Sequence, residues 1–186
     1  CIGAPSVWEP IPIPTDDPQD GPAARHAVGC LAQRLFMSAD YRTLDSLMSR
    51  YAGTLADLPD GGSHYAGLIN GLHDLFFYGG MDIPQLLGRT ADWRRSVRTS
   101  LKPDLMEALI FEASAWSVRG HGTADSISTQ SWAMFAYRTE MAAASLTDTK
   151  SIAKTDPAWY QASLNIGLDQ GLGADQMEGA GQAALE

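Results

Sequence analysis

The spacing of the apolar residues is the feature that most constrains how this chain can fold. From residue 22 onward, large apolar side chains recur every three or four positions, which is the period of a helix that buries one face. A clear example is the stripe formed by Tyr65, Leu68, Ile69, Leu72, Leu75 and Phe76. No segment shows a convincing alternation of apolar and polar residues, the pattern that a half-buried strand requires. The sequence therefore predicts an all-α protein.

Residues that start and stop helices divide this pattern into about seven to eight helices. Gly79-Gly80 ends one helix, Asp82 begins the next, and Asp156-Pro157 combines an N-cap with proline at the first helical position. The connections are short, so neighbouring helices are expected to pack antiparallel as hairpins. Although no strict repeat recurs, we predict a single domain over 22–186, with the hairpins stacked as a tetratricopeptide-like α-α superhelix.

The first 21 residues are predicted to form an extended, proline-rich tether, because proline fixes φ and lacks a backbone donor. The chain begins with Cys1 followed by small residues, as mature bacterial lipoproteins do. Alternatively, Cys1 forms a disulfide with Cys30 in an oxidising compartment, or the chain starts at an arbitrary boundary. Lipidation and this disulfide exclude each other, because both use the sulfur of Cys1. We expect a periplasmic protein or an outer-membrane-anchored lipoprotein.

The acidic net charge of the chain indicates which kinds of partner molecule it can bind. The formal net charge is −9, whereas a surface that binds nucleic acid needs a basic face for the phosphates. We therefore expect no nucleic acid and instead a protein partner, with a basic partner favoured. The uninterrupted apolar runs are too short for a transmembrane helix, so membrane contact is expected only through a lipid on Cys1.

No residue pattern predicts catalysis, a metal or a cofactor. The histidines fit no zinc-ligand spacing, and His121 would need an orienting carboxylate such as Asp125 to act as a base. Carboxylates paired from Glu107, Glu112 and Glu140 could cleave glycosidic bonds, but ion pairs with arginines are the favoured interpretation. We predict that the chain is not an enzyme and holds no cofactor and no metal.

Aromatic residues are the best candidates for contact with a partner. The chain has five tryptophans; most are expected in the core, while one or two in a groove would anchor a protein partner. The candidate anchors are Trp93, Trp132 and Tyr160, together with His121 in its glycine-flanked loop.

The segment R-G-H-G that begins at Arg119 is interpreted as the end of a helix. Trp116 and Arg119 are three residues apart and share a helix face, and Gly120 can adopt the left-handed conformation that ends a helix. Arg119 in the last turn also complements the negative end of the helix dipole. A structural role of the same kind, in starting a helix and packing it, is assigned to Asp156, Pro157 and Trp159.

Three short motifs resemble a bacterial domain-of-unknown-function family. They are A-W-S-V-R-G at 115–120, W-A-M-F at 132–135 and D-P-A-W-Y at 156–160. The family has tetratricopeptide-like helical hairpins, with an A-W-x-x-R-G segment followed by a P-x-W-Y helix, and the match covers roughly residues 31–171. Members usually continue with further helices, whereas this chain stops soon after Gly171. The resemblance implies an α-helical repeat fold and no established activity.

These observations lead to one functional expectation with two rivals. We expect a non-enzymatic, helical-repeat, protein-binding module of the bacterial cell envelope, most specifically an immunity or inhibitor lipoprotein that acts against a secreted toxin. The first rival is an envelope hydrolase directed at peptidoglycan, which would use the helix-borne carboxylates. The second is a structural scaffold within a larger complex.

Overall fold

The computed structural model describes residues 21–52, 58, 61–120, 122–173 and 175. Across these residues the chain forms seven α-helices and two short 3₁₀ helices and contains no β-strand, which confirms the predicted all-α, helical-hairpin fold. Its contacts divide the chain into two compact units, 1–79 and 80–186. The single domain expected over 22–186 stays a prediction, and the two units are described separately below.

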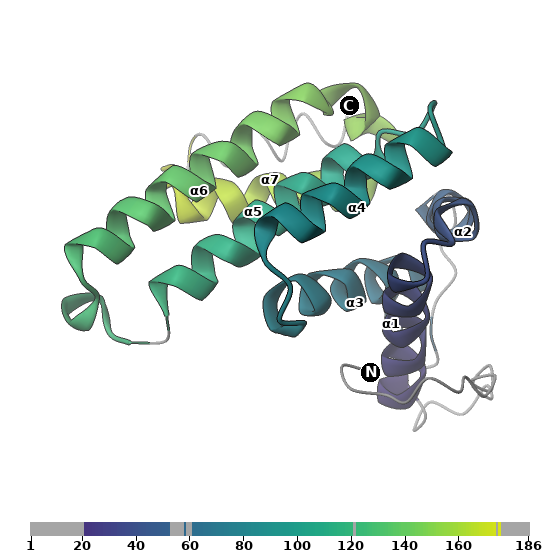
Figure 1. Ribbon diagram of the computed structural model, residues 1–186, viewed down its shortest axis with the longest axis horizontal. Coiled ribbons are helices and arrows are strands. Elements are labelled where there is room, and N and C mark those ends of the chain that lie inside the picture. Colours follow the sequence, from purple (N-terminus) through teal and green to yellow (C-terminus); the bar gives the residue numbers. More distant parts are fainter. Residues whose placement is uncertain (1–20, 53–57, 59–60, 121, 174, 176–186) are drawn as a thin grey trace. The chain divides into compact units, whose positions relative to one another are not determined.

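The first unit contains α1 (Gly21–Met37), α2 (Tyr41–Ala52) and α3 (His64–Tyr78) (Figure 1). Phe36 is fully buried at its centre, with its ring edge-on to Tyr41 at 6.0 Å and to Phe76 at 5.6 Å between centroids. Each helix therefore contributes an aromatic ring to one core, as the apolar spacing requires. Helix α1 begins at Gly21, the last residue of the predicted tether and one residue before the predicted start of the helical domain, because proline at the next position is well tolerated in a first turn.

Helices α1 and α3 touch at two glycines. A β-carbon placed on Gly71 would lie 2.3 Å from the Cα of Gly29, so no side chain fits at this crossing. Gln33 fixes the contact, because its buried Nε2 donates a hydrogen bond of 2.8 Å to the carbonyl oxygen of Gly71. The backbones of the two helices consequently approach more closely than side chains would allow.

Cys30 lies on α1 with 7% of its surface exposed and is disulfide-bonded. The other cysteine of the chain, Cys1, lies outside the described residues, as does the rest of the predicted tether up to residue 20.

The second unit is built around α5 (Lys102–Arg119), of which ten residues are buried. Around it lie α4 (Ile83–Ser96), α6 (Thr129–Asp148) and α7 (Pro157–Asp169), with 3₁₀ helices η2 (Ala124–Ser126) and η3 (Lys150–Thr155) in the connections. Figure 1 shows α6 running alongside α5, its main packing partner. No helix in the described ranges is both long and apolar enough to cross a membrane.

Two of the predicted helix starts have the expected capping geometry. Asp82 and Gln85 form a reciprocal capping box at α4. The side chain of Asp156 accepts a hydrogen bond from the backbone of Ala158, and Pro157 occupies the first turn of α7. The sequence allows for an eighth helix after α7, but apart from residue 175 the chain from 174 onward lies outside the described residues.

Candidate functional site

Helix α6 is buried along one narrow side. Only four of its twenty residues are buried, and their spacing of four, three and four residues places them on a single face. They are Phe135, Thr139, Ala142 and Leu146. Because this face is the one that packs into the unit, most of the circumference of α6 is open to solvent.

The open side of α6 carries apolar side chains. Met134 is 37% exposed and Tyr137 57% exposed, Ala144 is exposed, and Met141 is half-buried. The four positions follow one another at intervals of three, four and three residues, which is the spacing of a seam between two packed helices. We call Met134, Tyr137, Met141 and Ala144 the α6 stripe. Such a stripe can take up the apolar face of a second helix.

An arginine stacked between aromatic rings lies where α5 ends and α6 begins. The guanidinium carbon of Arg119 is 5.0 Å from the ring centroid of Trp116 and 5.0 Å from that of Trp132. Phe135 meets both tryptophans edge-on, at 5.3 Å and 5.7 Å between centroids. The Nε1 atom of Trp132 also points at the carbonyl oxygen of Ala124, 3.4 Å away. Cation–π and edge contacts therefore join the two helix ends.

The R-G-H-G segment has the geometry of a helix end. Gly120 has a φ of 79°, a conformation that favours glycine, and its N–H donates to the carbonyl oxygen of Trp116 at 3.0 Å. Arg119 donates from Nη1 to the carbonyl oxygen of Gly120 at 3.1 Å. The ψ of Gly120 is −177°, so its backbone is extended rather than left-handed helical. The structural role of Trp116, Arg119 and Gly120 stays a prediction. His121, a candidate for partner contact, lies outside the described residues.

The three glutamates considered for catalysis have different surroundings. Glu107 accepts hydrogen bonds from Thr90 at 2.9 Å and from Arg94 at 2.7 Å, and Glu140 is exposed on α6. Burial lowers the pKa of Arg94, but its hydrogen bonds to Glu107 and Asp104 outweigh this effect and raise it. Glu107 thus belongs to an ion-pair network that joins α4 to α5, the favoured interpretation.

A carboxylate pair that the sequence analysis missed lies near the aromatic rings. Glu112 is 7% exposed, and its charge acts on Asp169 at the end of α7. Burial raises the pKa of Asp169 to about 6, and Glu112 adds to this rise, while the hydrogen bond from Trp116 and the charge of Arg119 oppose it. Trp116 Nε1 donates to Asp169 over 3.0 Å across 53 positions of sequence. No local sequence signal could reveal a pair so widely separated.

The proposed anchors Trp93, Trp132 and Tyr160 are placed very differently. The prediction for Trp93 is wrong: it is 0% exposed, because it shares the inward face of α4 with Leu86 and Thr90. Trp132 is 36% exposed at the start of α6, and its ring packs edge-on against the buried Phe135. Tyr160 is half-buried on α7 and packs edge-on against Trp159 at 5.3 Å.

Trp159 forms two hydrogen bonds at the junction of α6 and α7. Its Nε1 donates to the carbonyl oxygen of Leu146 and to the hydroxyl oxygen of Thr149, both at 3.1 Å. These hydrogen bonds fix the start of α7 against the end of α6. A half-buried tryptophan whose N–H is paired in this way is consistent with the packing role predicted for it.

In the described part of the chain, no group of three histidine, cysteine or acidic side chains is placed to hold a metal ion. In comparisons with protein-family models, with curated proteins and with solved structures, nothing matches the chain. The resemblance to a domain-of-unknown-function family consequently stays a prediction.

Proposed function

We propose that this chain is a non-enzymatic protein-binding module that takes up an amphipathic helix of a partner protein on the α6 stripe. The observation that carries the proposal is the exposure of Met134 and Tyr137 at helix-pairing spacing on a helix already anchored by its other face. Large apolar side chains gathered on an exposed surface are typical of interaction sites.

The charges around the α6 stripe favour a basic partner. Glu140 and Asp148 are exposed on α6, and Asp125 is exposed just before it. Arg138 contributes little to this surface, because its guanidinium donates to the carbonyl oxygen of Ser114 on α5 at 2.7 Å. With a net charge of −9 on the chain, a second copy would be repelled and a basic helix attracted.

We place this activity in the bacterial cell envelope, most specifically as an immunity or inhibitor protein. A disulfide on Cys30 supports an oxidising compartment such as the periplasm. If the disulfide joins the two cysteines of the chain, the sulfur of Cys1 is not free for a lipid, which favours the periplasmic form over the lipid-anchored one.

A hydrolase has one observation in its favour. The raised pKa of Asp169 beside Glu112 is a property that general acids share. However, Asp169 already accepts a hydrogen bond from Trp116, and such a pair in a helical core is more simply structural. The scaffold alternative predicts binding as well, but with no dependence on the α6 stripe.

The proposal can be tested with a fluorescent helical peptide in which leucines repeat every three or four residues and lysines fill the other positions. Fluorescence anisotropy should show saturable binding to the full chain, and Tyr137→Glu should weaken it about tenfold or more, because a charge is then buried against leucine. The matched control is Met37→Glu, since Met37 is 42% exposed at the end of α1 in the first unit.

The same peptide with glutamate in place of lysine should bind far more weakly, because like charges then meet. Equal binding of both peptides would remove the basic-partner part of the proposal. Equal losses from Tyr137→Glu and Met37→Glu would remove the α6 stripe as the binding surface.

A further inference from the structure

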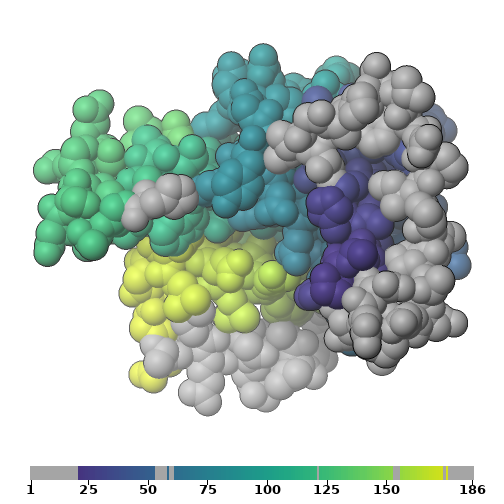
Figure 2. All heavy atoms as spheres, turned by 90° about the horizontal axis from the view of Figure 1, so that it is seen from below, coloured from purple at the N-terminus to yellow at the C-terminus, as the bar shows by residue number. Residues whose placement is uncertain are grey.

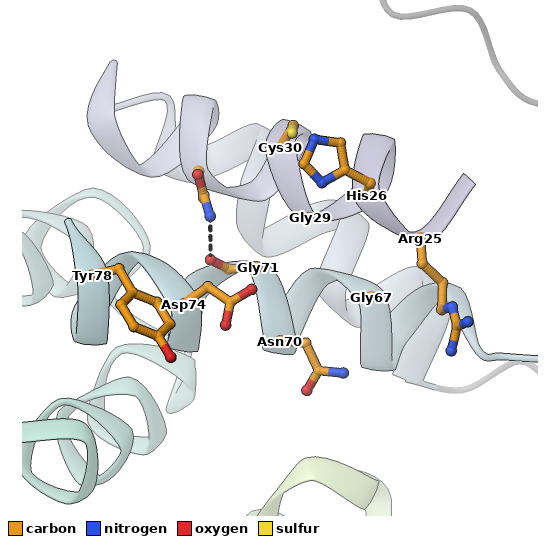
Figure 3. Close-up of a pocket in the computed structure, with 10 residues that line it drawn as sticks. Arg25, His26, Gly29, Cys30, Gly67, Asn70, Gly71, Asp74 and Tyr78 are labelled. Atoms are coloured by element: carbon orange, nitrogen blue, oxygen red, sulfur yellow. Dashed lines mark hydrogen bonds between the residues drawn. The ribbon is translucent and has the colours of Figure 1, made fainter. Parts of the chain in front are cut away.

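A groove of about 420 Å³ lies between α1 and α3 in the first unit (Figure 3). The glycines of the helix crossing, Gly29, Gly67 and Gly71, are among the residues that line it. This volume falls in the range of sites that hold small molecules. The first turns of α1, purple in Figure 2, are at the surface of the face shown there. Five of the polar side chains that line the groove are exposed, so a ligand can reach it from solvent.

Polar groups rim the groove. Arg25 and His26 line it from α1, and Asn70, Asp74 and Tyr78 line it from α3. The three α3 residues are four positions apart, so they form one row along the helix, and all five side chains are exposed. A groove with a backbone floor and a row of donors and acceptors is suited to a polar ligand that lies lengthwise.

The opposite charges of Arg25 and Asp74 lie at different ends of the groove. A β-carbon on Gly67 would lie 3.9 Å from the carbonyl oxygen of Arg25, so Arg25 stands level with Gly67. Asp74 lies seven residues further along α3, which is about 10 Å at the rise of an α-helix. Figure 3 shows Arg25 at one end, Asp74 and Tyr78 toward the other, and Asn70 between them.

We propose that this groove binds short peptides of about three residues through their free amino and carboxyl termini. An extended peptide of that length spans about 10 Å, which matches the distance along α3 from the level of the Arg25 backbone to Asp74. Arg25 would hold the carboxylate and Asp74 the ammonium group. The side-chain amide of Asn70, which can both donate and accept, would meet a peptide group between them. A single amino acid is too short to reach both ends.

The length requirement can be measured by isothermal titration calorimetry of the full chain with alanine, trialanine and pentaalanine. Trialanine should bind at least about tenfold more tightly than alanine, and pentaalanine should gain nothing further. N-acetyl-trialanine and trialanine amide, each lacking one terminal charge, should each bind about tenfold more weakly. No detectable binding of trialanine at millimolar concentration would overturn the proposal.

Two variants assign each terminus to its residue. In Asp74→Asn, acetylation of trialanine should no longer weaken binding, while amidation should still do so. In Arg25→Gln, the pattern should be reversed. The matched controls are Asp92→Asn and Arg42→Gln, exposed positions away from the groove lining, which should keep both effects.

Far-UV circular dichroism and melting temperature should verify that all four variants are folded. If both capping effects persist in Asp74→Asn and Arg25→Gln, the peptide binds elsewhere and the proposal is wrong. The α6 stripe is not involved in this experiment, so the result does not depend on the function proposed above.

Discussion

Arg119 stabilises the chain through contacts on three sides. Its guanidinium stacks on the rings of Trp116 and Trp132 and donates to the carbonyl oxygen of Gly120. A planar, delocalised cation can make the stacked and the hydrogen-bonded contacts at once, which a lysine cannot. The end of α5 therefore depends on the shape of this side chain as well as on its charge.

Arg119→Ala should lower the free energy of unfolding by about 1–2 kcal/mol, since it removes a partly buried hydrogen bond and two cation–π contacts. Trp116→Ala should cost about 3 kcal/mol or more, because it also leaves Asp169 without a donor. Urea denaturation measures both. Arg119→Lys should recover less than half of the loss; full recovery would show that charge alone matters.

Asp169 makes the stability of the chain depend on pH. Its pKa is raised from an ordinary value of 3.8 to about 6 in the folded chain, so between these values the folded chain binds more protons than the unfolded one. The contribution of Asp169 to stability is thus fully present below about pH 4 and is lost as pH rises through about 6.

Asp169→Asn should remove this dependence and stabilise the chain at pH 7.5 by roughly 1 kcal/mol, after allowance for screening by solvent. The asparagine keeps an oxygen to accept the hydrogen bond of Trp116. Denaturation curves from pH 4 to 7.5 compare the variant with the native chain. An unchanged slope of stability against pH would show that another group is responsible.

For single residues, the sequence predicts the backbone conformation better than it predicts which other residues surround the side chain. The end of α5 at Gly120 and the cap at Asp156 follow from local chemistry, so both were predictable. The burial of Trp93 depends on which side of α4 meets α5, and periodicity alone cannot distinguish a core tryptophan from one that lines a groove. The pairing of Asp169 with Glu112 depends on tertiary packing alone.

At the scale of the elements, a residue that caps one helix can also bind a second helix. Asp156 caps α7 and is 3% exposed, and its Oδ2 lies 3.6 Å from Nζ of Lys102 at the start of α5. One carboxylate therefore joins the starts of two helices. The sequence predicts the cap, because an aspartate before a proline is a local signal, but not the ion pair.

Two substitutions separate these functions of Asp156. Asp156→Asn keeps an oxygen for the cap but removes the negative charge, and should cost about 1–2 kcal/mol, because the half-buried Lys102 loses its partner. Asp156→Ala removes both and should cost about 1 kcal/mol more. Equal losses in thermal or urea denaturation would mean that the cap contributes nothing measurable.

At the scale of the whole molecule, the periodic pattern predicts the helices but not how they are grouped. Each of the two units has its own buried centre, Phe36 in the first and Trp93 in the second. The close contact of α1 and α3 at their glycines helps to explain why the first three helices form a unit of their own, which the sequence pattern does not predict. A glycine inside a helix is expected from sequence to destabilise that helix. Here Gly71 instead allows the backbone of α3 to contact Gly29 of α1.

Two glycine substitutions should change the stability of the two units in opposite directions. Gly71→Ala should destabilise the first unit by about 2–3 kcal/mol, because its β-carbon would overlap the backbone of Gly29. Gly88→Ala, where a β-carbon meets nothing within 4 Å in α4, should stabilise the second unit by about 0.5–1 kcal/mol through helix propensity.

Tryptophan fluorescence can report the unfolding of the second unit separately from that of the first. Four of the five lie in the second unit, and Trp8→Phe removes the fifth. In that background, Gly71→Ala should shift part of the far-UV circular dichroism melt to lower temperature and leave the tryptophan fluorescence transition in place. Gly88→Ala should raise the fluorescence transition by a few degrees. If Gly71→Ala lowers both transitions together, the chain unfolds as one cooperative domain, as expected from the sequence, and the two units are not thermodynamically separate.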